Sequence, residues 1–253
     1  MHIETIGSGA PLVLIHGWGM HGGVWGDVAK SLSQQYQVHC VDLPGFGASA
    51  ALAKTDLDSL VRSLSEHFVE SVHVCGWSLG GQVVMHWAVR EPDKVKKLVV
   101  VTSTPCFTER DDWLFGLPSE VLEKFAAELE QNHAATLRRF ISLQLRGSEN
   151  ERELLTKLRE QLFSRGEPDM SALRGGLEIL RDADQRPEVA SIKQQTLVIA
   201  GQRDKLTPPA ASYYLAQVVP NARLVEIEGA SHAPFLSHPD MFVAHVSDFL
   251  KNN

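Results

Sequence analysis

Short runs of apolar residues alternate with segments of helical periodicity along the first and last parts of the chain. Such runs are typical of strands buried on both faces of a parallel sheet, and the helical patterns between them are typical of connecting helices. The strand-like runs lie at residues 12–15, 72–75, 98–102, 195–200 and 222–227, and an amphipathic helix is expected over residues 242–249. The pattern therefore predicts an α/β fold with a mainly parallel sheet and flanking helices.

The middle of the chain has a different pattern, because no long strand-like run occurs between about residues 105 and 186. Four helices are expected there, one beginning at residues 119–123 and the others over residues 134–145, 149–163 and 172–180. We interpret this segment as an all-helical lid inserted in the sheet. The predicted organisation is a single domain over residues 1–253, with a core of residues 1–104 and 187–253 and a lid of residues 105–186.

Composition and charge narrow the class of protein. The 253 residues are 43% hydrophobic and 22% charged, which is ordinary for a globular enzyme domain with a sizeable core. The formal net charge of -7 at pH 7 argues against general nucleic-acid binding. The first residues lack the basic and apolar regions of a secretion signal, and no stretch approaches the roughly 18 apolar residues of a membrane span. We therefore expect a soluble cytoplasmic protein, monomeric and independent of membranes.

The three cysteines are an odd number, which argues against a disulfide framework. Cys40 and Cys75 lie in strand-like runs, and Cys106 follows the last strand of the first half. We expect buried, reduced thiols.

The strongest chemical signal is Gly76-Trp77-Ser78-Leu79-Gly80, which follows a strand-like run directly and precedes a helical pattern over residues 81–90. A serine on a sharp turn from strand to helix is the nucleophile elbow of an α/β-hydrolase, and glycines two residues to either side let strand and helix pack closely. The alternative is that Ser78 merely caps the helix. The surrounding strand and helix favour the elbow.

A base and an acid follow in the order that such hydrolases use. Asp204 lies just beyond the strand-like run at residues 195–200, and His232 lies beyond the run at residues 222–227. Alone, an aspartate in a turn usually bonds local backbone, and a single histidine is more often a surface or core residue. Together with the elbow they predict a triad: Ser78 as nucleophile, His232 as base and then acid, and Asp204 orienting the imidazole.

An acyl transfer also needs hydrogen-bond donors for the oxyanion. We expect one to be the backbone N–H of Leu79, which follows the nucleophile, and the other to be the backbone N–H of Trp18. Trp18 lies between two glycines after the strand-like run at residues 12–15, so the backbone there is able to pass close to Ser78. His16 offers a metal ligand or a base as alternatives, but it has no partner motif, and hydrogen bonding within the loop is the favoured interpretation.

Six segments together resemble the family of pimeloyl-acyl carrier protein methyl ester carboxylesterases of biotin synthesis. They are residues 16–19, 41–49, 76–81, 110–113, 175–180 and 232–235. The resemblance implies an α/β-hydrolase fold and hydrolysis of the methyl ester at the end of a pimeloyl chain carried on acyl carrier protein, with release of methanol. It implies no metal and no redox cofactor.

The predicted lid is basic within an acidic chain. Residues 138–165 carry seven lysines and arginines against four glutamates. A solvated helix surface is one interpretation, and a docking surface for an acidic acyl carrier protein is the other. The resemblance favours docking and implies contacts by Arg139 and Arg152. Ala135 and Thr156 stand where two further arginines are expected. Arg138 and Arg159, each three residues further along, are the candidates to replace them.

The resemblance also implies which residues line the acyl chain. Phe140, Ile141 and Leu143 are expected to form an apolar wall, with Gln144 donating or accepting a hydrogen bond. Simple packing of the lid is the alternative. Trp77 and Trp18 are either packing or pocket residues, and the position of Trp77 beside the nucleophile favours the pocket.

Two rival functions stay open on the sequence. One is a hydrolase of small esters or of carbon–carbon bonds with the same fold, since fold alone does not choose the acyl group. The other is a noncatalytic member that binds a ligand without turnover, against which the presence of all three triad residues argues.

Overall fold

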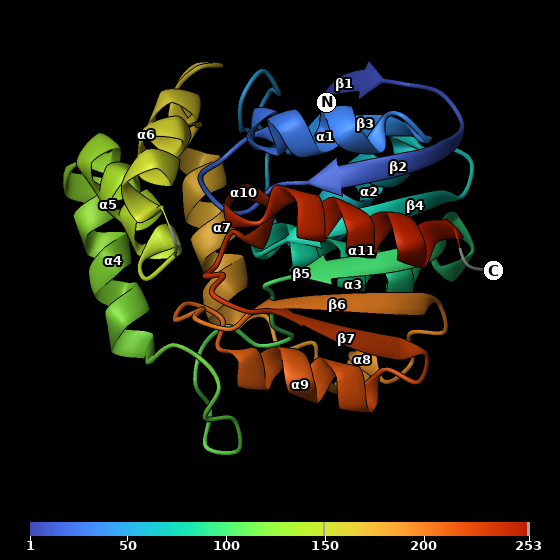
Figure 1. Ribbon diagram of the computed structural model, residues 1–253. Helices are drawn as coiled ribbons and strands as arrows, with labels where there is room; N and C mark the ends of the chain where they lie inside the picture. The colour runs from blue at the N-terminus through green and yellow to red at the C-terminus, as the bar shows by residue number, and fades with distance from the viewer. Residues whose placement is uncertain (149, 252–253) are drawn as a thin grey trace.

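The computed structural model describes residues 1–148 and 150–251, and its centre is a seven-stranded sheet with the order β1-β3-β2-β4-β5-β6-β7 (Figure 1). Only β1 runs antiparallel to its neighbour, and every other pair is parallel. The strands are β1 (His2–Ile6), β2 (Ala10–Ile15), β3 (Tyr36–Asp42), β4 (Val72–Trp77), β5 (Val95–Val101), β6 (Gln195–Gly201) and β7 (Ala222–Ile227).

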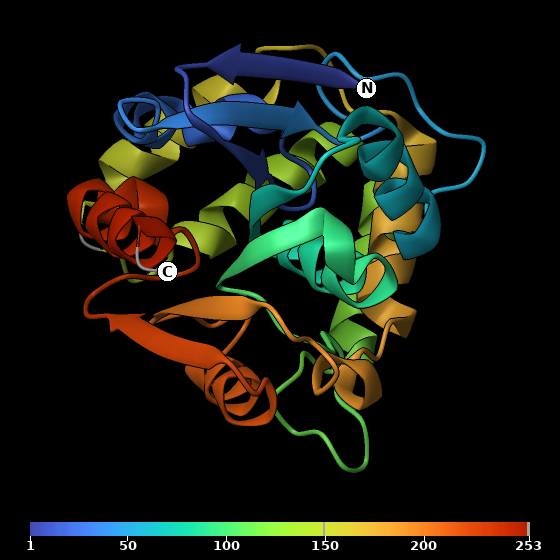
Figure 2. The ribbon, with the colours of Figure 1, turned by 90° about the vertical axis from the view of Figure 1, so that its right-hand side faces the viewer.

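Helices cover both faces of this sheet. Figure 2 shows α1 (Gly26–Leu32) and α11 (Pro239–Lys251) on one face and α2 (Leu57–His67) and α3 (Leu79–Arg90) on the other. The central strands are buried on both faces, and every residue of β4 is buried. This explains their continuous apolar sequence, since a parallel strand between two helical layers has no solvent-facing side. The predicted α/β-hydrolase fold class is confirmed.

Four further helices lie together at one end of the strands (Figure 1). They are α4 (Ser119–Gln131), α5 (His133–Leu145), α6 (Glu151–Leu162) and α7 (Met170–Asp182). α4 packs against α5 and α7, and α5 packs against α6. Each predicted lid helix is present, although Glu149, where the third was expected to begin, lies outside the described residues.

The edges of the sheet depart from the simple apolar pattern. β1 is an exposed antiparallel edge strand, and β3 alternates buried and half-buried residues along its first half, so neither shows a continuous apolar run. The remaining helical segments are η1 (Gly22–Trp25), η2 (Pro92–Lys94), α8 (Arg186–Val189), α9 (Pro209–Val218) and α10 (Pro234–Ser237). In the described ranges no helix has the length and apolar character needed to cross a membrane.

The three cysteines are buried and unpaired, which confirms the expected reduced thiols. Burial raises the pKa of the Cys40 thiol to about 12 and raises the pKa of Cys75 further still. At neutral pH both thiols are protonated and behave as small apolar core residues.

Candidate active site

Ser78 lies between the end of β4 and the start of α3 in a strained backbone conformation, with φ 56° and ψ -119°. Glycine is required on both sides of it. A Cβ on Gly76 would lie 2.2 Å from the carbonyl oxygen of Gly80, and a Cβ on Gly80 would lie 2.5 Å from the carbonyl oxygen of Ile15. The Ser78 side chain makes no capping bond to the helix. Its hydroxyl is therefore held out of the helix and presented to the loops beyond the strands.

Ser78, His232 and Asp204 form a continuous chain of hydrogen bonds. The Ser78 Oγ lies 3.0 Å from His232 Nε2, and His232 Nδ1 lies 2.8 Å from Asp204 Oδ2. Each side chain follows a different parallel strand, and the residues are at most 8% exposed. A carboxylate beside Nδ1 places the imidazole proton there, which leaves Nε2 as the acceptor for the serine proton.

Asp204 has more partners than the histidine alone. It accepts from the backbone N–H groups of Leu206 and Thr207 and from the Thr207 hydroxyl, at 2.7–3.1 Å. These bonds fix the carboxylate in place and compensate for its burial. Thr207 was not assigned to the site from the sequence, although its position three residues after an aspartate is a common site for such a bond.

The backbone of His232 is held from the sheet. Its carbonyl oxygen accepts from the Trp77 indole N–H and from the Thr102 hydroxyl, both at 2.7 Å. Trp77 is fully buried and packs edge-on against Phe235. The indole N–H of Trp77 is therefore used to hold the loop that carries His232, and a contact of its ring with substrate stays a prediction. Thr102 was missed, although a polar residue ending a buried apolar strand is a signal for it.

The loop after β2 approaches the serine closely. A Cβ on Gly17 would lie 3.1 Å from the Cβ of Ser78, so the neighbouring backbone N–H of Trp18 is near the nucleophile. In the described part of the chain no acceptor is paired with this N–H or with that of Leu79. Two free donors beside a serine hydroxyl suit a developing oxyanion.

His16 supports this loop as expected, through both ring nitrogens. Its Nδ1 donates to the carbonyl oxygen of Gly17 at 2.8 Å, and its Nε2 accepts from the backbone N–H of Leu43 at 3.0 Å. Burial lowers the pKa of His16 to about 4, against the opposing effect of its bond to Gly17. The neutral ring is thus the form that bonds the loop. Among the described residues, no cluster of His, Cys, Asp and Glu side chains could hold a metal ion.

The lid residues expected beside the acyl chain divide into two sets. Phe140 packs edge-on against Trp18, with ring centroids 5.1 Å apart, and Ile141 is buried. Gln144 is also buried, and its side-chain oxygen has no partner within the described residues, so it is available to a bound group. Leu143 is 37% exposed, so its side chain lies partly in solvent, and its place in the apolar wall stays a prediction.

The C-terminal end of α5 also holds the loop that carries His232 directly. The backbone N–H of His232 donates to the carbonyl oxygen of Gln144 at 3.1 Å, and the Ser231 hydroxyl donates to that of Arg146. The Arg203 guanidinium donates to the carbonyl oxygen of Gly147. The last carbonyls of a helix lack partners within the helix, so these bonds cap α5 with the loops that carry the triad.

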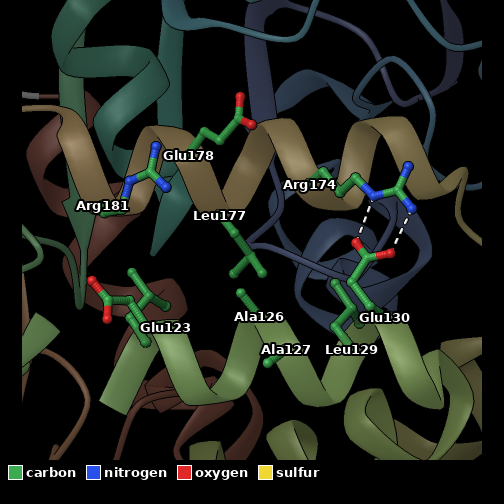
Figure 3. Close-up of a pocket in the computed structure, with 10 residues that line it drawn as sticks. Glu123, Ala126, Ala127, Leu129, Glu130, Arg174, Leu177, Glu178 and Arg181 are labelled. Atoms are coloured by element: carbon green, nitrogen blue, oxygen red, sulfur yellow. Dashed lines mark hydrogen bonds and ion pairs between the residues drawn. The ribbon is translucent and has the colours of Figure 1, made fainter. Parts of the chain in front are cut away.

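A cleft of about 360 Å³ opens between α4 and α7 (Figure 3). Its apolar lining comes from both helices and includes Leu122, Ala126, Leu129 and Leu177. At one end, two hydrogen bonds of 2.5 Å join the Arg174 guanidinium to the Glu130 carboxylate across the cleft. The neighbouring side chain Phe125 contacts Trp18 instead, with ring centroids 5.4 Å apart. The cleft thus lies on the outer side of the helices that cover Ser78.

The lid arginines differ in their partners. Arg139 forms an ion pair with Glu128 of α4. Arg138 lies over the ring of Phe163, and Arg159 donates to the Ser142 hydroxyl at 3.4 Å. Within the described residues no carboxylate lies at ion-pair distance from Arg138, Arg152 or Arg159, and all three are exposed. A row of exposed, unpaired positive charge therefore runs along α5 and α6.

The sequence of the chain is similar to those of known protein families and proteins. Residues 10–239 match the family model described as alpha/beta hydrolase fold. The chain is 43% identical over 244 residues to a pimeloyl-[acyl-carrier protein] methyl ester esterase of Nitrosomonas europaea, covering 96% of this chain and 97% of that protein. It is 41% identical over 251 residues to the protein of the same name from Chromobacterium violaceum, covering 99% and 98%.

A solved structure shows the same fold at low identity. The esterase EaEST from Exiguobacterium antarcticum superposes with a TM-score of 0.90 at 22% identity, covering 99% of this chain and 95% of that one. At this identity the likeness concerns the fold alone.

Proposed function

Because this chain belongs to the pimeloyl-[acyl-carrier protein] methyl ester esterase family, within the alpha/beta hydrolase fold, we propose that it hydrolyses the methyl ester of a pimeloyl chain carried on acyl carrier protein. The reaction consumes water and yields methanol and a free carboxylate on the far end of the carried chain. The observation that carries the proposal is the hydrogen-bond chain from Ser78 through His232 to Asp204.

The first half of the reaction forms an acyl-enzyme. The Ser78 oxygen attacks the ester carbonyl carbon while its proton passes to His232 Nε2, and Asp204 stabilises the resulting imidazolium. The carbonyl oxygen becomes an oxyanion, for which the backbone N–H groups of Trp18 and Leu79 are the donors. The tetrahedral intermediate then expels methoxide, which takes the proton from Nε2 and leaves as methanol.

The second half returns the free enzyme. A water molecule attacks the acyl carbon, gives its proton to His232 Nε2, and forms a second oxyanion at the same two donors. Collapse of this intermediate breaks the bond to Ser78, whose oxygen recovers the proton from Nε2. The product is released as a carboxylic acid, which loses its proton to water at neutral pH and becomes a carboxylate where the ester had been.

The lid supplies the apolar environment of the acyl chain in this proposal. Residues 105–186 form the lid, with Phe140 and Ile141 against the chain and the side-chain oxygen of Gln144 free to accept a hydrogen bond. Ser78 is 8% exposed, so only a small part of the nucleophile is open to solvent beneath the lid helices.

The exposed arginines of α5 and α6 are the proposed docking surface for the carrier. Arg138, Arg152 and Arg159 supply charge without a carboxylate partner among the described residues. Arg139 is a weaker candidate than the resemblance implied, because it would have to exchange Glu128 for a group on the carrier. An acidic carrier is attracted to such a surface before any specific contact forms.

The direct test is to supply the pimeloyl methyl ester both on acyl carrier protein and as a free ester, and to measure methanol release. We expect the wild-type protein to convert the carrier-linked ester and the Ser78→Ala variant to be inactive on both. Conversion of free esters alone would favour a general esterase. A wild-type protein that hydrolyses neither ester, and whose Ser78 is not labelled by a fluorophosphonate, would leave only a ligand-binding function.

A further inference from the structure

Two adjacent glycines, Gly175 and Gly176, lie in the middle of α7. Each costs a helix about 1 kcal/mol relative to alanine, so their presence calls for a packing reason. The structure gives each glycine a different neighbour. A Cβ on Gly175 would lie 2.5 Å from the Cβ of Thr55, whereas a Cβ on Gly176 would lie 2.6 Å from Cδ1 and 3.0 Å from Nε1 of the Trp18 indole.

The Trp18 ring has no room to yield. It is 1% exposed, and its Nε1–H donates to the carbonyl oxygen of Leu173, one turn earlier on α7, at 2.9 Å. Phe125 of α4 and Phe140 of α5 pack edge-on against it, with ring centroids 5.4 Å and 5.1 Å away. A displacement imposed on this ring is therefore passed to its own backbone.

The same turn of α7 also contacts the side chain of Leu79, whose backbone N–H is the other proposed oxyanion donor. The Cβ position of Gly176 lies 3.5 Å from Cδ2 of Leu79. On its outer side α7 is joined to α4 by the bonds between Arg174 and Glu130 (Figure 3). The helix is thus held between α4 and the loop that follows β2.

We propose that α7 sets the position of the Trp18 backbone N–H relative to Ser78, and that Gly176 is a positioning residue for the oxyanion donors. This inference rests on the proposed esterase function. The absence of a side chain at Gly176 lets the helix lie directly on the indole, and the bond from Trp18 to Leu173 fixes the register of the contact.

The test is the Gly176→Ala variant, assayed on a free short-chain methyl ester so that carrier docking plays no part. We expect kcat to fall by about tenfold to a hundredfold with little change in KM, less than the roughly 100- to 1,000-fold cost of removing an oxyanion donor outright. Affinity for a trifluoromethyl ketone, which forms a tetrahedral oxyanion on the serine, should fall by a similar factor. Gly175→Ala adds the same methyl group one residue away, 2.5 Å from the Thr55 Cβ and 2.8 Å from the Thr55 backbone oxygen, so it measures the cost of crowding α7 without touching the indole, and it should lower kcat less than Gly176→Ala does.

Repeating the substitution in a Trp18→Leu variant keeps the test decisive if Gly176→Ala distorts α7. In Trp18→Leu the indole is absent and the flexible leucine is able to turn away from α7, so adding Gly176→Ala should cost less than threefold in kcat. Equal losses from Gly176→Ala in both backgrounds, or wild-type kcat and inhibitor affinity in the single variant, would overturn the positioning role. Failure of the proposed function itself would show separately, as a wild-type protein that neither hydrolyses the ester nor is labelled at Ser78.

Discussion

The loops that carry Asp204 and His232 bury their charged groups and fix them with hydrogen bonds, whereas the outer face of α5 and α6 leaves its charged groups exposed. Asp204 and His232 are buried, and each has several fixed hydrogen-bond partners. Arg152 and Arg159 are exposed and have no carboxylate partner among the described residues. A proton transfer over about 3 Å requires fixed atoms, whereas attraction of a charged partner requires only accessible charge of the right sign.

The surface between α4 and α7 also differs from the surface of α5 and α6 in the sign and the pairing of its charged side chains. Around the cleft between α4 and α7, Glu123, Glu130 and Glu178 outnumber Arg174 and Arg181. Both of these arginines are already paired, Arg174 with Glu130 and Arg181 with Asp182. An acidic carrier is therefore expected to avoid this cleft and to meet the lid at α5 and α6 instead.

The largest effect should come from removing a member of the triad. We expect Ser78→Ala and His232→Ala each to reduce kcat for any ester by at least about 1,000-fold, because the members act as a unit. Asp204→Asn should also lose about 1,000-fold or more, since an amide in place of the carboxylate favours the wrong imidazole tautomer. Steady-state hydrolysis of a free short-chain ester measures all three.

Folding must be shown to be intact for this result to count, and circular dichroism together with thermal unfolding provides the control. Turnover within tenfold of wild type in either Ser78→Ala or His232→Ala would contradict the assigned mechanism. A charge reversal on α5 or α6 should have no such effect on the free ester, which is the contrast between the two regions.

The next effect concerns the stability of the core at low pH. The folded state holds His16 neutral with a pKa of about 4, whereas an unfolded histidine titrates near 6.5. The unfolded chain therefore binds a proton that the folded protein does not, and the free energy of unfolding should fall by about 3 kcal/mol between pH 7 and pH 4 from this residue. The stabilisation is fully present above about pH 6.5.

Urea unfolding at pH 7 and pH 4.5 measures this dependence in the wild type and in His16→Asn, which cannot titrate. We expect the variant to be less stable at pH 7, because it loses ring hydrogen bonds, but to lose less stability on acidification. Equal pH dependence in the two proteins would show that His16 does not titrate as its burial implies. A carbon-13 NMR titration of the His16 ring gives an independent value.

Much of the core could be predicted because its signals are local in sequence. The continuous apolar runs mark the central parallel strands, and the loops that follow β4, β6 and β7 carry Ser78, Asp204 and His232 in turn. Strand β1 was missed, since an exposed edge strand has no continuous apolar run. The role of Trp77 could not be predicted either, because its partner is a backbone carbonyl 155 residues away.

In the lid, the sequence predicts where helices lie better than which way their residues face. The helical pattern over α5 was clear, but whether Leu143 faces the substrate or the solvent depends on how α5 packs against α4 and α6. The pairing of Arg139 depends on Glu128, which lies on the preceding helix. Resemblance assigned roles to these positions, and the tertiary contacts decide between them.

The smallest effect should come from the exposed arginines, and it should depend on the substrate. We expect Arg152→Glu/Arg159→Glu to reduce kcat/KM for the carrier-linked methyl ester by about tenfold or more at low salt, because steering of an acidic partner is lost. The free ester is uncharged and should be hydrolysed at nearly the wild-type rate. Raising the ionic strength to 0.5 M should narrow the difference between variant and wild type on the linked ester, since the Debye length falls well below its value of about 10 Å at 0.1 M.

A matched control separates docking from net charge. Arg62→Glu/Lys96→Glu makes the same change in total charge at two exposed positions outside the lid, on α2 and near the start of β5, and should leave both substrates unaffected. If that control lowers activity on the linked ester as much as the lid variant does, overall charge governs the encounter and the α5–α6 face has no special part in it. If the lid variant slows both esters equally, Arg152 and Arg159 support the lid, and the contrast between a fixed catalytic region and an accessible docking surface does not hold.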